Sequence, residues 1–158
     1  MSTNAEKAYE FLKEKEGEDQ GHGDWFEVTQ DRIDAFADAT LDHQFIHVDV
    51  ERATAETPFG GTIAHGFLTL SLMVHLTTSI KVELPPLDGL IMGINYGMNK
   101  MRFINPVPAG SKIRAHSKLA SVELKGNAID QTRTVTVEIE GQDKPALVAD
   151  WIGRMVFA

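Results

Sequence analysis

Cysteine is absent from this 158-residue chain, which excludes disulfides, thiol nucleophiles and thiolate-ligated metals. Basic residues are in the minority, with 15 Lys and Arg against 23 Asp and Glu, and the formal net charge is −8. Nucleic-acid-binding domains are usually basic, so this balance argues against such a partner. No apolar run approaches the roughly 20 residues that cross a bilayer. The charged N-terminus also lacks the apolar segment of a signal peptide. We therefore expect a cytoplasmic protein with no membrane span and no nucleic-acid partner.

The length fits a single domain, residues 1–158, with a sizeable core. A charged helix is predicted within residues 1–20, and a short strand is predicted at 25–29. Thr29 is a suitable N-cap for an amphipathic helix that runs to Ala39, and Asp49 is a possible cap for a weaker helix.

The most apolar segment of the chain covers residues 62–80 and is apolar on nearly all sides, which predicts a buried helix at residues 66–80. The second half of the chain instead alternates apolar and polar residues, which predicts four long strands. These strands are expected at residues 90–103, 111–124, 130–140 and 146–157. In the first of them the alternation changes phase near Gly97, which indicates a bulge.

A sheet of about five strands must have one face covered, and only the helix at 66–80 is apolar enough to cover it. The pattern therefore predicts an α+β hot-dog fold, in which a curved antiparallel sheet wraps around one central helix. Residues 29–64 would form a helical overhang beside it.

The stretch TLDHQFIHVD, residues 40–49, places Asp42 and His47 in apolar surroundings. Five residues turn a helix by about 140°, and an odd spacing on a strand places two side chains on opposite faces. Only a turn can therefore bring these two side chains to one point. Alternatively, Asp42 caps a turn and His47 is a semi-buried histidine with its hydrogen bonds satisfied.

A second unusual stretch, FGGTIAHG at 59–66, ends where the buried helix is predicted to begin. The first N–H groups of a helix have no partner within it, and the helix dipole favours negative charge there. The N–H of Gly66 is thus a candidate donor to an oxyanion. The alternative is that Gly60, Gly61 and Gly66 serve only turns and packing. The stretch lacks the Lys-Ser/Thr of a phosphate-binding loop.

Residues 34–72, DAFADATLDHQFIHVDVERATAETPFGGTIAHGFLTLSL, resemble the MaoC-like, (R)-specific enoyl-CoA hydratase family. Residues 95–115, NYGMNKMRFINPVPAGSKIRA, resemble its NodN-type branch. Leu41 stands where the wider family has glycine, and Gln44-Phe45 stand where it has Asn-Pro. The form D-H-Q-aromatic-I-H is similar to that of the NodN-type branch.

The resemblance implies that Asp42 and His47 hold one water, which adds syn across the C2=C3 bond of a trans-2-enoyl-CoA. The product would be a (3R)-hydroxyacyl-CoA, and Gly66 N–H would stabilise negative charge on the thioester oxygen. A carboxylate can act as a base and an imidazole can take or give a proton near neutral pH, which suits this chemistry. No cofactor and no metal would be needed. Six further residues are assigned to the substrate pocket: Phe45, Ile46, Ile63, His65, Ser71 and Asn95.

The resemblance also implies a homodimer whose cleft lies at the interface. Two other functions remain open. One is a thioesterase that uses a carboxylate to activate water against the thioester carbonyl. The other is a non-catalytic module that binds acyl thioesters. His75, within the predicted helix, is expected to be a core histidine, and the Ser71 hydroxyl could instead bond back to the preceding helical turn.

Overall fold

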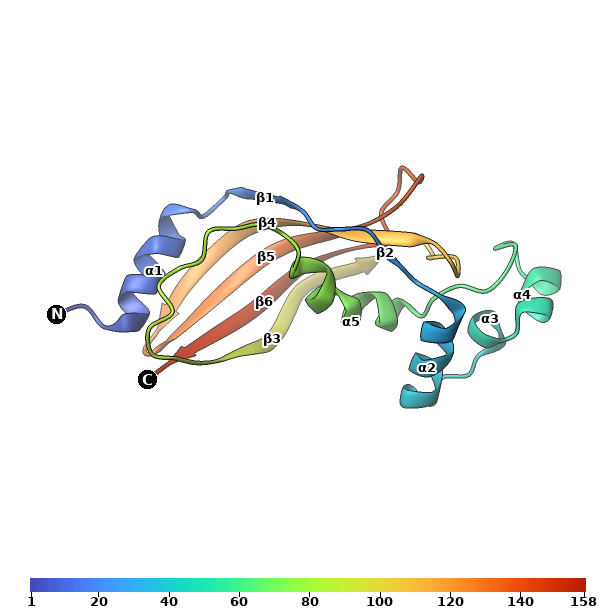
Figure 1. The fold of residues 1–158 in the computed structure, drawn as a ribbon, viewed down its shortest axis with the longest axis horizontal. Helices are drawn as coiled ribbons and strands as arrows, with labels where there is room; N and C mark the ends of the chain where they lie inside the picture. The colour runs from blue at the N-terminus through green and yellow to red at the C-terminus, as the bar shows by residue number, and fades with distance from the viewer.

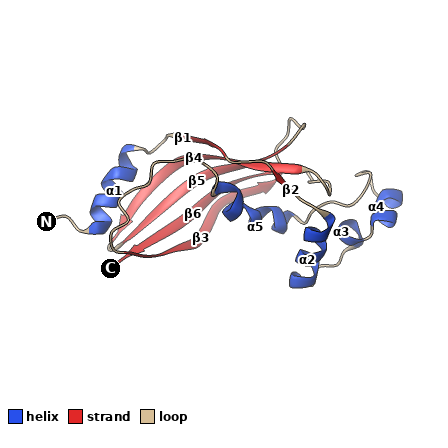
Figure 2. Ribbon diagram, in the orientation of Figure 1, coloured by secondary structure: helices blue, strands red, loops and turns tan.

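A curved antiparallel sheet forms the body of the protein in the computed structural model, which describes all of residues 1–158 (Figures 1 and 2). Its strands are β1 (Asp19–His22), β2 (Phe26–Glu27), β3 (Leu90–Phe103), β4 (Lys112–Lys125), β5 (Ala128–Ile139) and β6 (Leu147–Phe157). Their order is β1-β4-β5-β6-β3, and β2 also pairs with β4. Every pairing is antiparallel. The four long strands and the α+β architecture predicted from the sequence are thus confirmed.

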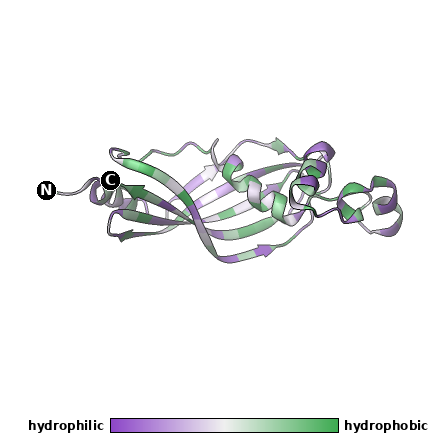
Figure 3. Cartoon of the chain, turned by 90° about the horizontal axis from the view of Figure 1, so that it is seen from below, coloured by the Kyte–Doolittle hydropathy of each residue, from purple (hydrophilic) through white to green (hydrophobic).

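Helix α5 (Gly66–Thr77) lies across one face of this sheet, here called the inner face (Figure 1). Leu68, Met73 and Leu76 of the helix belong to a core of 17 buried residues that includes Val135 and Val137 of β5. Figure 3 shows hydrophobic stretches along the strands and through the helix above them. Burying each such side chain contributes about 1.5–3 kcal/mol, so packing α5 on the sheet stabilises the fold.

The opposite side of α5 is not covered within the chain. Phe67 and Val74 are 65% and 48% exposed. His75 also lies on this side, with its ring edge against Phe26. The prediction of a core histidine was therefore wrong. The helix is apolar on nearly all sides, so its sequence does not indicate that only one side packs on the sheet.

A second, smaller core lies where α1 (Asn4–Glu14) packs against the far end of the sheet. Thr3 and Glu6 cap this helix reciprocally. The helix is shorter than the segment 1–20 in which it was predicted, and β1 follows it instead. Gly17 has a φ of +90°, which favours glycine and stops the helix.

Three short helices form the overhang at the other end of the sheet: α2 (Gln30–Thr40), α3 (Phe45–Val48) and α4 (Val50–Glu56) (Figure 1). The Thr29 hydroxyl accepts from Arg32 N–H at 3.2 Å, and the Asp49 carboxylate accepts from Arg52 N–H at 3.0 Å. Both predicted caps are thus confirmed. Helix α3 was not predicted, since four residues show no helical period.

Strand β3 forms one edge of the sheet and therefore has one unpaired side. Its register against β6 shifts between Asn95 and Gly97, which confirms the predicted bulge. Several large apolar side chains along it are exposed: Ile91, Met92, Ile94, Tyr96 and Met98. None of the helices has the length and apolar character needed to cross a membrane.

Candidate active site

A sharp turn between α2 and α3 carries Asp42 toward His47. Helix α2 ends in Leu41, whose φ of +63° reverses the direction of the chain. Helix α3 begins three residues after Asp42, and His47 lies within it. The two side chains are thus brought together by a break in regular structure, as their spacing required. This left-handed conformation is one that glycine adopts easily and leucine does not. The Leu41 side chain is 82% exposed, so its burial contributes little to offset the strain.

His47 is 7% exposed, and its Nδ1 lies 2.7 Å from the carbonyl oxygen of Ile63. A carbonyl oxygen only accepts hydrogen bonds, so Nδ1 carries the hydrogen and Nε2 is left as an acceptor. Burial lowers the pKa of His47 below its usual value, and the neighbouring His65 adds to this lowering. The hydrogen bond to Ile63 and the charge of Asp42 act in the opposite direction. The imidazole is therefore neutral at pH 7 and can receive a proton at Nε2.

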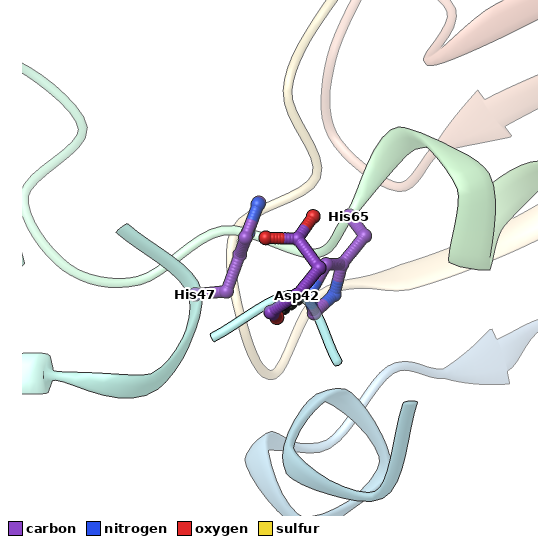
Figure 4. Close-up of side chains that lie close together, drawn as sticks. All are labelled: Asp42, His47 and His65. Carbon is purple, nitrogen blue, oxygen red and sulfur yellow. Dashed lines mark hydrogen bonds between the residues drawn. The ribbon is translucent and has the colours of Figure 1, made fainter. Parts of the chain in front are cut away.

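His65 holds both of these residues in place. It is 2% exposed, and its Nε2–H donates to the backbone carbonyl of Asp42 at 3.0 Å. Its ring stacks on that of His47, with the centroids 3.8 Å apart and the planes 24° from parallel. Figure 4 shows the carboxylate of Asp42 beside these two rings. The Nδ1 atom of His65 is buried and has no hydrogen-bond partner.

One carboxylate oxygen of Asp42 and one ring nitrogen each of His47 and His65 lie within 4.8 Å of one another. One water can bridge two acceptors at such a separation, because each hydrogen bond spans about 2.7–3.0 Å. The residue types would also suit a transition metal. However, an imidazole lone pair lies in the ring plane, and two stacked rings cannot both point at an ion about 2.0–2.1 Å away. The arrangement therefore suits a water better than a metal.

A mostly apolar cleft of about 350 Å³ opens beside His47. Ile63, Gly66 and Phe67 line it, together with the segment Phe103–Val107. The backbone N–H of Gly66 donates no hydrogen bond within the chain, so it is free to meet a ligand in this cleft. A Cβ added at Gly66 would lie 2.9 Å from the ring of Phe103, so close packing also requires glycine there. Gly60, with a φ of +75°, is a turn glycine.

The structure places the predicted site residues in two groups. Asp42, His47, His65, Ile63 and Gly66 lie around one point at the start of α5. Ser71 and Asn95 instead line a separate hollow of about 290 Å³ farther along this helix. The Ser71 hydroxyl donates to the carbonyl of Phe67 at 2.8 Å, which is the local bond that helix hydroxyls commonly make.

Phe45 and Ile46 do not line the cleft. The ring of Phe45 lies under the guanidinium of Arg52, at 3.9 Å from the ring centroid. The carbonyl of Ile46 accepts from Ile63 N–H at 3.0 Å, so this residue joins α3 to the segment before α5. The cleft also contains Asn105, Pro106 and Val107, which were not among the predicted site residues. These three residues lie in the stretch 95–115 that resembles the NodN-type branch, and this resemblance was the only sequence signal that could have assigned them to the site.

A curved sheet wrapped around a central helix defines the hot-dog fold. In this protein an aspartate and a histidine form a polar site near the start of that helix, beside an apolar cleft. The chain belongs to the MaoC-like dehydratase family, since the MaoC like domain matches residues 12–141. It is thereby a member of a family of hydro-lyases. The family resemblance predicted from residues 34–72 is confirmed.

Two curated relatives are similar over most of the chain. The chain is 51% identical over 141 residues to 3-hydroxyacyl-thioester dehydratase Z of Mycobacterium tuberculosis, covering 89% of this chain and 90% of that one. It is 49% identical over 142 residues to nodulation protein N of Rhizobium leguminosarum bv. viciae, covering 89% and 86%. The solved structure of the R-hydratase PhaJ1 from Pseudomonas aeruginosa has a TM-score of 0.66 at 21% identity, covering 89% of this chain and 81% of that one, and shows the same fold.

Proposed function

We propose that the protein is an (R)-specific enoyl-CoA hydratase/dehydratase, which adds water reversibly to trans-2-enoyl-CoA and forms (3R)-hydroxyacyl-CoA. The observation that carries this proposal is the pair Asp42 and His47. A carboxylate oxygen of Asp42 and a ring nitrogen of His47 lie within 4.8 Å of each other, and His47 lines the apolar cleft. The name of the relative in Mycobacterium tuberculosis supports a 3-hydroxyacyl thioester as the product of hydration.

In this mechanism one water donates its two hydrogens to Asp42 and to Nε2 of His47. As its oxygen bonds to C3, the O–H bond facing His47 breaks and Nε2 takes the proton. His47 then gives a proton to C2, while the Asp42 carboxylate stabilises the transient imidazolium. Because oxygen and proton both arrive from the side of this pair, the addition is syn.

Attack at C3 moves negative charge through C2 onto the thioester oxygen. The free N–H of Gly66 is proposed to meet that oxygen, with the N-terminal end of the α5 dipole behind it. Removing one such donor typically lowers the rate by roughly 10²–10³-fold. The proposed reaction uses no metal and no redox cofactor, and CoA is part of the substrate. A catalyst accelerates both directions, so the same residues serve dehydration.

We further propose that two copies form a homodimer with the cleft at their interface. Strand β3 has an unpaired edge. On the uncovered side of α5, the exposed Phe67 packs on Phe103 of β3, and the exposed Val74 lines a hollow with Met98 of β3. Exposed apolar surface next to a free strand edge favours association. Sedimentation equilibrium should give twice the chain mass of 17.4 kDa, and a monomer throughout the micromolar range would contradict the dimer.

The test is turnover of crotonyl-CoA, followed as loss of enoyl absorbance. Wild type should turn over, and Asp42→Asn and His47→Gln should each lower kcat by at least about 10²-fold while melting as cooperatively as wild type. Asp38→Asn is a matched control, because Asp38 lies near the end of α2, pairs with His43 at 2.8 Å and is outside the site. It should retain wild-type kcat.

A thiol reagent in the same assay separates the alternatives. A thioesterase would release free CoA thiol, whereas a hydratase leaves the thioester intact. A binding module would bind crotonyl-CoA and neither hydrate nor cleave it. No hydration of enoyl-CoAs from four to ten carbons would overturn the proposal for CoA substrates.

A further inference from the structure

The inner face of the sheet is interrupted by polar residues halfway along β5. Val135 and Val137 point into the core under α5, and Ile129 points into the core under α1. Alternate residues of a strand share a face, so Gln131 and Arg133 lie on this same face between the two cores. A charged residue in a position that packing would give to an aliphatic side chain indicates a use other than stability.

Arg133 has no anionic partner. Its side chain makes no ion pair and donates no hydrogen bond within the chain. Its guanidinium instead lies over the ring of Trp151, with the guanidinium carbon 4.5 Å from the ring centroid. Burial lowers the pKa of its guanidinium below the usual range, yet an arginine in a protein stays protonated. A half-buried guanidinium without hydrogen-bond acceptors in the chain is unfavourable, so this position favours the binding of an anion.

Arg133 lines a cavity of about 320 Å³ between the inner face and residues 81–89, here called the strap. In Figure 1 the strap leaves the end of α5, crosses the sheet toward α1 and then leads into β3. The other two charged residues in the lining are already neutralised. Arg154 pairs with Asp130 at 2.6 Å, and Glu83 pairs with Lys15 at 3.0 Å. The cavity therefore carries one uncompensated positive charge.

The rest of the lining suits a hydrocarbon. Its apolar side chains come from the strap, from β3, β6 and α1, and they are Leu12, Val82, Leu84, Leu87, Ile94 and Met155. The Asn95 side chain, which makes no hydrogen bond within the chain, adds a free polar group near Arg133. A volume of this size lies in the range of small-molecule sites.

We propose that this cavity binds the carboxylate end of an aliphatic chain, with the fork of the Arg133 guanidinium pairing with the carboxylate and the strap covering the methylenes. Guanidinium and carboxylate match in a planar, bidentate geometry, which is why arginine is preferred for such recognition. The neutral alternatives, an alcohol or a methyl end, would leave the charge of Arg133 uncompensated.

Two sources could supply this group. One is a free fatty acid. The other, which rests on the proposed hydratase function, is the far end of an acyl chain whose thioester lies in the cleft beside His47. The cavity shares Asn95 and Trp151 with the hollow at Ser71, and that hollow follows α5, whose first turn lines the cleft. Such an acyl group would be that of a dicarboxylic acid.

The binding test uses tryptophan fluorescence in the full chain and needs no turnover. The protein has two tryptophans, Trp25 and Trp151, so Trp25→Phe leaves Trp151 beside Arg133 as the only reporter. Octanoate should change its emission saturably, and octan-1-ol should bind more weakly. In this background Arg133→Met should weaken octanoate binding by roughly tenfold or more, because a charge-assisted hydrogen bond is lost.

Arg32→Met is the matched control, since Arg32 also lies over an aromatic ring, that of Phe26, but outside the cavity. It makes the same change in net charge and should leave octanoate affinity unaltered. Arg133→Lys keeps the charge without the planar fork and should bind with intermediate affinity. If Arg133→Met unfolds at a lower temperature than wild type, Arg133→Lys alone still tests whether the planar guanidinium pairs with the carboxylate. Absence of saturable octanoate binding, or equal affinity in wild type and both Arg133 variants, overturns the proposal.

A second arm identifies the source. The ratio of kcat/KM for an enoyl-CoA with a terminal carboxylate to that for its methyl-ended analogue is measured in wild type and Arg133→Met. A ratio that falls about tenfold assigns the cavity to the acyl chain, by the loss of the same charged bond. An unchanged ratio together with Arg133-dependent octanoate binding assigns it to a free acid. If no substrate turns over, the hydratase proposal fails while the octanoate result still decides the cavity.

Discussion

Replacing His65 with phenylalanine should separate the stability of the fold from the activity of the site. The variant keeps an aromatic ring against His47, where the centroids are 3.8 Å apart. It removes two polar features of the wild-type ring. One is the Nε2–H that donates to the Asp42 carbonyl at 3.0 Å, and the other is the buried Nδ1 without a partner.

Three effects on the free energy of unfolding of His65→Phe partly cancel. Loss of the hydrogen bond should destabilise by about 0.5–1.5 kcal/mol, and removal of an unsatisfied buried acceptor should stabilise by about 1–3 kcal/mol. The larger ring should destabilise by about 1 kcal/mol through crowding. We therefore expect His65→Phe to lie within about 1 kcal/mol of wild type. His65→Ala, which also loses the stack and leaves a cavity, should lose about 2–4 kcal/mol.

Activity should respond differently. Without the bond from His65, the backbone of Asp42 is no longer tethered, and its carboxylate is less well placed over the water. A misplacement of about 1 Å can lower a rate by up to roughly 10²-fold, so we expect kcat of His65→Phe to fall about tenfold with KM little changed. Urea denaturation and crotonyl-CoA kinetics on wild type, His65→Phe and His65→Ala measure both quantities. A kcat for His65→Phe within twofold of wild type would show that the tether does not position Asp42.

Three further predictions concern single positions. Because the pKa of His47 is lowered, its contribution to stability is complete above the ordinary value near 6.5 and decreases as pH falls through the lowered pKa. The acid limb of kcat/KM should follow the same group below about pH 6.5, and a midpoint above that value would contradict the neutral imidazole. Leu41→Gly should stabilise the protein by about 0.5–1 kcal/mol in urea denaturation, since φ is +63° and the relief of strain exceeds the entropy that glycine loses. Leu41→Ala, which keeps the strain, should not stabilise it. Gly66→Ala should destabilise by about 1–3 kcal/mol because its Cβ meets Phe103, and Phe103→Leu in the same chain should restore most of that loss.

Much of the fold was predictable because its signals are local. The strands of the second half alternate with period two, and α5 is the one segment apolar enough to cover a sheet. Thr29 and Asp49 cap helices through bonds to residues three positions away, so their role is visible in the sequence. The DQGH strand β1 lacks such a pattern, since its glycine and polar residues give no alternation.

The site was predictable only in part, because it depends on contacts between distant segments. The spacing of Asp42 and His47 required a turn, and the structure has that turn at Leu41. The stack of His65 on His47 joins residues 18 positions apart in sequence, and nothing in the spacing indicates it. Ser71 and Asn95 were grouped with the site, but Ser71 lies farther along α5 and Asn95 lies on β3, and both line another hollow.

The most direct test of the proposed mechanism is the stereochemistry of hydration of crotonyl-CoA in D₂O. If one water held by Asp42 and His47 supplies the hydroxyl, and the proton comes from the same side, the product has one configuration at both carbons. NMR coupling constants and a chiral assay should then give only the syn adduct, with (3R) configuration and deuterium at C2. Anti addition, or a mixture of configurations at C2, would contradict delivery from a single face by this pair.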